Sequence, residues 1–246
     1  MESEFVTLGI CQKEAKKECL KSSEAAFDEL QSVFFRVFRI FNDAMQRIWN
    51  NHELMTQKTE CGALRIIAGS GDEGVREREI FESILSVFSF SLLPVKQLIF
   101  EGSYVSACTL LRSNIETMVQ LRKILEGRYK TGETPRVSRE DESIRRIYSE
   151  ITGLAHLSDD VFLSDVTKGR SANSNYEILT PLFKMLSPQF NSGLGASLFA
   201  LHIICSIEII FRVNSYLEKN IPGRSLSVKD LSDLRECSEF VWSRFA

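Results

Sequence analysis

The segment YVSACTLLRSNIETMVQLRKIL, residues 104–125, contains an arginine and a glutamate within a largely apolar pattern. Arg112 and Glu116 are four residues apart, so a helix places them one turn apart on the same face, where they can form an ion pair. A guanidinium stabilises phosphate charge, and a neighbouring carboxylate can orient it. This polar face lies either in bulk water or in a wet cleft between helices. Its other members are Thr109, Ser113, Gln120 and Lys123.

A second helical segment, IRRIYSEITGLAH at residues 144–156, ends in a histidine. His156 shares one helical face with Arg145, Ser149 and Thr152, beside an apolar face that includes Tyr148. An imidazole at this position can serve as a general acid or base, or as a ligand. It can equally be a helix C-terminal histidine that is favoured by the helix dipole. One histidine does not decide between these interpretations.

Neither a metal ion nor a cofactor is predicted. A metal site would use His156 with the aspartates that follow it, but these residues lack a recognised ligand spacing, and aspartates after a helix usually form turns (Asp159, Asp160, Asp165). The segment GSGDEG carries acidic residues where a phosphate would bind, and it follows no predicted strand. No nucleophile elbow and no catalytic cysteine signature occurs.

Together, YVSACTLLRSNIET and IYSEITGLAH resemble a pattern of several prokaryotic all-helical families, some of them linked to abortive infection of phage-infected cells. The pattern is an L-R-S-x-x-E helix followed by Y-x-x-L-S-x-x-x-H. Ile151 and Thr152 stand where the pattern has Leu and Ser, and the resemblance covers about residues 80–160. The matching residues are Arg112, Ser113, Glu116, Tyr148 and His156.

These families are similar to the HEPN superfamily, in which many members are metal-independent ribonucleases that dimerise to form their site. The HEPN nuclease signature has four to six residues between an Arg and a His on one helix. Here Arg146 precedes His156 by ten positions and Arg145 by eleven. Either Arg112 supplies the guanidinium from another helix, or the site is not a nuclease site.

The resemblance implies a phage-defence or stress-response protein whose cleft holds four catalytic residues: Arg112, Glu116, Tyr148 and His156. In a ribonuclease, Arg112 would stabilise phosphate charge, His156 would move the proton, and Glu116 would orient Arg112. RNA would then be the substrate. The alternative is a non-catalytic module in which the same residues form a polar network and the bundle surface binds a partner protein or a small ligand.

Composition indicates a soluble globular protein, with 43% apolar and 26% charged residues among 246. The net charge of −3, from 30 basic and 33 acidic residues, provides no overall positive field for nucleic acid or an anionic membrane. Six cysteines are scattered without a C-x-x-C pair, and the N-terminal residues do not resemble a signal peptide. We therefore expect a cytoplasmic protein with reduced cysteines.

Residues 193–213 form an apolar stretch about as long as a membrane span. His202, Glu208 and Arg212 interrupt it, and each is costly at hydrocarbon depth, so we expect a core helix and no integral membrane insertion. Glu208 and Arg212 are predicted to pair. Asn114 lies on the apolar side of its own helix and, if buried, needs a hydrogen-bond partner. A peripheral membrane role for the 194–213 helix is a third, weaker hypothesis.

Overall, the sequence predicts one all-α domain over residues 1–246, a bundle of about six to eight helices without a sheet and with a HEPN-like core as one alternative. Its parts are an amphipathic helix at 24–57, a core with the motifs at 76–160 and C-terminal helices at 175–246. Ser22 or Ser23 should cap the first, and Pro94 should kink or end the second helix. The first helix has a regular apolar seam, and Phe35 and Phe38 widen it, which favours either packing inside a bundle or burial against a second copy. We expect a homodimer through an apolar helix face. The seam comprises Phe27, Leu30, Phe34, Val37, Phe41, Ala44 and Ile48.

Overall fold

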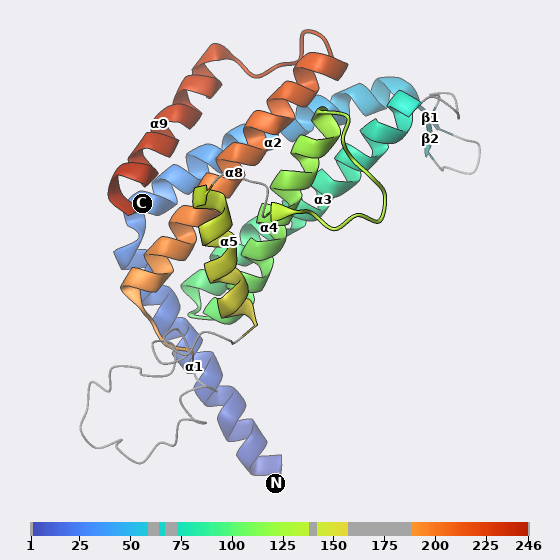
Figure 1. Cartoon of the computed structure of the whole chain (residues 1–246). Coiled ribbons are helices and arrows are strands. Elements are labelled where there is room, and N and C mark those ends of the chain that lie inside the picture. Colours follow the sequence, from blue (N-terminus) through green and yellow to red (C-terminus); the bar gives the residue numbers. More distant parts are fainter. Residues whose placement is uncertain (1, 59–63, 67–72, 138–141, 157–187, 246) are drawn as a thin grey trace.

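The computed structural model describes residues 2–58, 64–66, 73–137, 142–156 and 188–245 (Figure 1). Seven helices occur in this part of the chain, which confirms the predicted all-α class. They are α1 (Glu2–Ala26), α2 (Asp28–Met55), α3 (Glu73–Phe100), α4 (Tyr104–Leu125), α5 (Glu142–Ala155), α8 (Ser192–Asn220) and α9 (Val228–Phe245).

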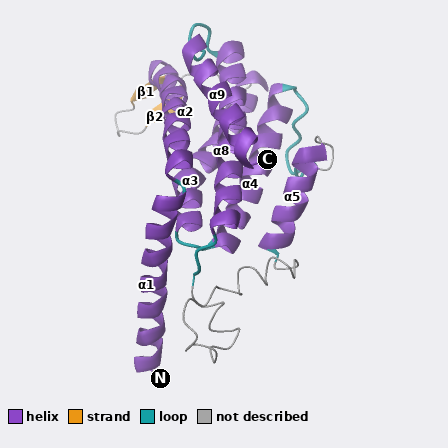
Figure 2. Ribbon diagram, turned by 90° about the vertical axis from the view of Figure 1, so that its left-hand side faces the viewer, coloured by secondary structure: helices purple, strands orange, loops and turns teal. Residues whose placement is uncertain are grey.

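The prediction that the chain has no sheet needs one small correction. The connection between α2 and α3 contains an antiparallel hairpin of β1 (Thr56–Lys58) and β2 (Leu64–Ile66), in which Gln57 pairs with Arg65. Strands of three residues are too short to produce the alternating pattern by which a strand is recognised in a sequence. The packed body of the protein is helical (Figure 2).

Helix α8 is the central element, and it packs against α2, α3, α4 and α9. Its apolar residues are buried around most of its circumference, as predicted for a core helix. Gly195 lets Phe27, which lies between α1 and α2, approach α8 closely, because a Cβ atom at Gly195 would lie 2.7 Å from the Phe27 ring. The predicted Glu208–Arg212 pair forms within α8, with 2.7 Å between Arg212 Nη1 and Glu208 Oε2.

The apolar seam predicted for the first helix is confirmed, because all seven of its residues are buried. However, the predicted start of that helix, at residue 24, is wrong. A further helix, α1, precedes it and extends beyond the bundle, and backbone hydrogen bonds continue across the bend at Phe27 (Figures 1 and 2). Ser22 and Ser23 therefore lie within α1, where the buried Ser23 hydroxyl donates to the Phe100 carbonyl at 3.1 Å.

Of the two outcomes expected at Pro94, a kink or an end of the helix, the end is wrong, since α3 continues through Pro94 to Phe100. Pro94 removes the hydrogen bond that would reach the carbonyl of Phe90. Phe90 is 80% exposed, so water can reach this turn of the helix. The helix ends at Phe100, just before Gly102, whose φ of 72° is a left-handed conformation that favours glycine.

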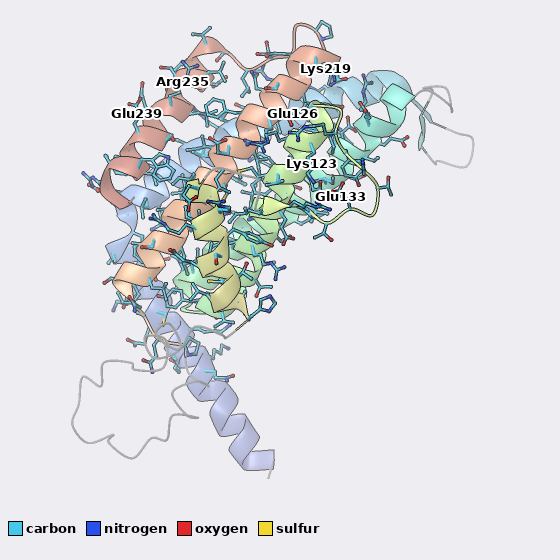
Figure 3. The ribbon with its side chains drawn as sticks, in the orientation of Figure 1. Lys123, Glu126, Glu133, Lys219, Arg235 and Glu239 are labelled. Carbon is cyan, nitrogen blue, oxygen red and sulfur yellow. The ribbon has the colours of Figure 1, made fainter. Side chains whose placement is uncertain are left out.

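Helices α4 and α5 position the predicted site residues, and they pack against each other. Helix α4 ends before Gly127, which also has a positive φ of 67°. The loop that follows returns to the bundle, where Val137 is buried and the Gln120 side-chain amide donates to the Glu133 carbonyl at 3.1 Å. Figure 3 shows Glu133 on this loop, near the end of α4.

Candidate functional site

The four residues predicted for the site lie together, although they come from two separate parts of the chain. Helix α4 provides Arg112 and Glu116, α5 provides Tyr148, and His156 directly follows α5. Nη1 of Arg112 is 2.8 Å from Nε2 of His156, a contact between residues 44 positions apart. We call this group the Arg–His cluster.

A shared set of hydrogen bonds holds Arg112 in the cluster. Its Nε donates to Oε1 of Glu116 at 3.1 Å and to the hydroxyl of Tyr148 at 3.2 Å. The Tyr148 hydroxyl donates in turn to the same Glu116 oxygen at 2.5 Å. The Arg112 guanidinium also lies over the Tyr148 ring, with Cζ 5.8 Å from the centroid. These contacts orient the guanidinium toward His156.

The cluster favours a charged arginine beside a neutral phenol. The pKa of Arg112 is raised, first by its hydrogen bond with Tyr148 and then by the charge of Glu116. Burial raises the pKa of Tyr148, and its hydrogen bond to Glu116 raises it further. Tyr148 therefore remains a hydrogen-bond donor at neutral pH.

The tautomer of His156 follows from its contact with Arg112. A guanidinium has donors only, so Nε2 of His156 must accept the hydrogen bond, and the ring proton of the neutral imidazole is on Nδ1. Nε2 becomes available to a substrate once Arg112 turns toward another acceptor. An oxyanion bound to the guanidinium would provide that acceptor.

A groove of about 760 Å³ lies beside the cluster, between α5 and the loop after α4. Of the four cluster residues, Tyr148 is the one that lines it. The α5 face predicted from the sequence contributes Arg145, Ser149 and Thr152 to the same wall, opposite the loop after α4. The Thr152 hydroxyl is buried and has no hydrogen-bond partner among the described residues. A ligand in the groove could provide one.

The loop after α4 adds residues that sequence reasoning missed. Arg136 lines the groove and lies 3.5 Å from Glu133, while Arg145 on the other wall pairs with Glu142. The loop sequence is polar and contains proline and glycine, which is typical of any surface connection. Only the buried Val137, which anchors the loop, distinguishes it from such a connection, and a single valine is no signal in a sequence.

Two other polar residues noted in the sequence are buried inside the helical bundle. Asn114 is buried, and its Oδ1 accepts a hydrogen bond of 2.7 Å from Ser91, whereas its Nδ2 has no partner in the described part of the chain. His202 is fully buried, and its Nε2 lies 2.9 Å from the Leu92 carbonyl oxygen. These residues lie apart from the Arg–His cluster.

The alternative metal site cannot be placed, because the three aspartates after His156 lie outside the described residues. Within those residues, no group of three or more histidine, cysteine or acidic side chains could hold a metal ion. The chain matches no protein-family model, no curated protein and no solved structure in the three comparisons made. The geometry of the Arg–His cluster is therefore the feature that bears on function.

Proposed function

We propose that this protein is a helical ribonuclease of phage defence or stress response, and that it cleaves RNA at the Arg–His cluster without a metal ion. The observation that supports this proposal is the 2.8 Å contact between Arg112 and His156. It joins a phosphate-binding group to a proton-transfer group across two helices. The assignment to phage defence rests on the motif residues of α4 and α5.

In the proposed reaction, a phosphodiester oxygen binds Arg112 and takes the place of the imidazole. Nε2 of His156 then removes the proton from the adjacent ribose 2′-hydroxyl. The 2′-oxygen forms a bond to phosphorus while the bond to the 5′-oxygen breaks, which leaves a 2′,3′-cyclic phosphate. The departing 5′-oxygen takes a proton from water, and the hydroxide that this leaves accepts the proton held by His156, which is exposed at the surface. Arg112 stabilises the charge that develops on the phosphate.

The groove beside the cluster would bind the RNA on one side of the cleaved bond. Arg136 and Arg145 line its walls and can contact further phosphates, and Tyr148 joins the groove to the cluster. This local arrangement provides cationic contacts that a chain with a net charge of −3 lacks as a whole.

The test is cleavage of end-labelled RNA by the purified full chain in the presence of a chelator. We expect cyclic-phosphate products, and a loss of roughly 100-fold or more in rate for His156→Ala. Arg235→Ala, which removes an exposed cation from α9, is the matched control and should cleave at the wild-type rate. If the wild-type protein leaves the RNA intact, the proposal is wrong.

A non-catalytic role is the second candidate, because the cluster satisfies its own hydrogen bonds. Glu116 compensates Arg112, and Nε2 of His156 is already occupied, so the same contacts could simply fasten α5 to α4. In that case, a double-mutant cycle of Arg112 and Glu116 would show coupling in thermal stability. None of the variants would change any activity.

We also propose that the protein acts in the cytoplasm as a homodimer that does not insert into a membrane. Two helices, 77–100 and 192–220, are long and apolar enough to cross one, with mean hydropathies of 1.6 and 2.0. However, α8 lies in the core of the bundle, so residues 194–213 offer little free surface for the peripheral membrane hypothesis. The exposed apolar side chains of α3 offer a surface for a second copy: Val87, Phe90 and Leu93.

A further inference from the structure

A second groove lies on the other face of α5 from the Arg–His cluster. Two adjoining cavities of about 340 and 250 Å³ share four lining residues, so they form one continuous groove along α8: Ile147, Leu201, Ile204 and Trp242. Its sides are α5 and the Trp242 ring of α9. We call it the α8 groove.

One end of the α8 groove is apolar. Leu154 of α5 and the first turns of α8, with Leu194 and Leu198, line this end. The groove remains open here because α5 packs mainly on α4. Arg146 and Glu150, 3.8 Å apart at the rim, contribute the charged groups of this end. A hydrocarbon chain placed here would bury apolar surface that water now contacts.

The other end of the α8 groove carries two arginines, Arg122 and Arg212, and one glutamate, Glu208. Nη1 of Arg212 donates to the Glu208 carboxylate at 2.7 Å and to the Glu208 backbone carbonyl at 2.6 Å. Arg122 lies 3.9 Å from Glu126. The arginines thus bring guanidinium groups to this end of the groove.

Arg212 is the residue that points to a ligand. Its side chain is only 14% exposed, and its Nε is buried without a partner in the part of the chain that the structure describes. A buried donor that forms no hydrogen bond is costly, and more so on a charged group. Because Glu208 occupies Nη1, the edge formed by Nε and Nη2 is the one that can receive a carboxylate through two parallel hydrogen bonds.

We propose that the α8 groove binds a single-chain amphipathic carboxylate, a long-chain fatty acid. Its carboxylate would bind Arg212, and its hydrocarbon chain would follow α8 toward Leu194. Those two residues are 18 positions apart, which corresponds to about 27 Å along a helix. A groove of that length suits a long acyl chain better than a short one. The proposal is independent of the ribonuclease proposal, since the two sites use different faces of α5.

Trp242 offers a direct probe, because the chain has two tryptophans and only Trp242 lines the groove. The experiment uses the full chain with Trp49→Phe, to which palmitate is added below the concentration at which it self-associates. We expect a saturable change in Trp242 fluorescence, matched by heat released in calorimetry. Octanoate, whose chain is short, and hexadecanol, which has no carboxylate, should bind more weakly. If calorimetry detects no saturable binding of palmitate, the proposal is wrong.

Two kinds of variant separate a specific site from general adsorption. Arg212→Lys keeps the charge but removes the Nε–H edge, and it should weaken palmitate binding roughly tenfold while hexadecanol binding stays nearly unchanged. Ser197→Phe places a ring in the apolar end at an exposed position and should block both ligands. Ser215→Phe, the same change at another exposed position of α8, is the control and should bind normally. Equal palmitate affinity in all three variants would overturn the proposal.

Discussion

The hydroxyl of Tyr148 donates a 2.5 Å hydrogen bond to Oε1 of Glu116, so a residue of α5 holds the carboxylate that orients Arg112 on α4. Hydrogen bonds to a charged acceptor are among the stronger ones in proteins. The contact also joins α5, which His156 directly follows, to α4. This bond is therefore one of the contacts that hold the cluster together.

Tyr148→Phe should destabilise the protein by about 1–2 kcal/mol, because Glu116 loses a donor while Arg112 remains as its partner. RNA cleavage, if it occurs, should fall as well, since Arg112 would be less well oriented. Urea denaturation measures the first effect and the labelled RNA assay the second. Tyr129→Phe removes a hydroxyl from the loop after α4, outside the cluster, and should leave both unchanged. A Tyr148→Phe protein as stable as the wild type would show that the bond contributes nothing.

His202 should make the protein less stable in mild acid. Burial lowers the pKa of His202 to about 4 from an ordinary value of 6.5. As the pH falls below 6.5, the unfolded chain takes up a proton that the folded protein does not, so stability is lost down to about pH 4. The loss approaches about 3 kcal/mol over this range.

The measurement for His202 is the free energy of unfolding between pH 7 and pH 4.5, compared between the wild type and His202→Phe. The variant keeps a ring next to Phe34, whose centroid lies 5.6 Å from the imidazole. It should be less stable at pH 7, because the hydrogen bond between the imidazole and the Leu92 carbonyl is lost. Its dependence on pH should nevertheless be weaker. Parallel curves for the two proteins would show that His202 does not cause the acid sensitivity.

Ser91 and Asn114 should be energetically coupled. Ser91→Ala removes the donor to the buried Oδ1 of Asn114 and should cost about 1–2 kcal/mol. The double variant Ser91→Ala with Asn114→Leu leaves no buried amide, so it should be more stable than the two single changes predict when added. Chemical denaturation of the four proteins gives the coupling. Simple additivity would mean that the two side chains act separately.

Phe90→Glu should convert the proposed homodimer into a monomer. Phe90 is 80% exposed and lies beside other exposed apolar residues of α3, so a charge there would be buried in the interface. Light scattering after size-exclusion chromatography measures the mass. Val228→Glu is the control, because Val228 is also an exposed apolar residue, 86% exposed, at the start of α9. A wild-type protein that is monomeric at all concentrations would rule out the dimer.

The parts of the fold that could be predicted depend on regular spacing. The seam from Phe27 to Ile48 repeats every three or four residues, and such a repeat can bury one face only as a helix. The start of α9 is also determined locally, because the amide of Asp230 donates to the Ser227 hydroxyl at 3.1 Å. The polar faces of α4 and α5 could be identified in the same way. The motif residues led to the expectation that these two faces lie together.

The features that were missed depend on contacts between distant residues. Ser23 looks like a helix cap, but the Phe100 carbonyl, 77 positions away, provides its partner inside the bundle. Pro94 looks like a helix end, but the helix continues where one face is open to water. Arg136 became a groove residue only because its loop returns to α5. The spacing of neighbouring residues in the sequence does not indicate contacts between residues so far apart.

Helix α5 separates the groove beside the Arg–His cluster from the α8 groove. Tyr148 on one face of α5 lines the first groove, and Ile147 on the other face lines the second. A ligand bound against Ile147 would contact the same helix that carries Tyr148 and its hydrogen bond to Glu116. If such a ligand changed the affinity of the Arg–His cluster for RNA, RNA would change the affinity for that ligand by the same factor, because couplings between binding sites are reciprocal.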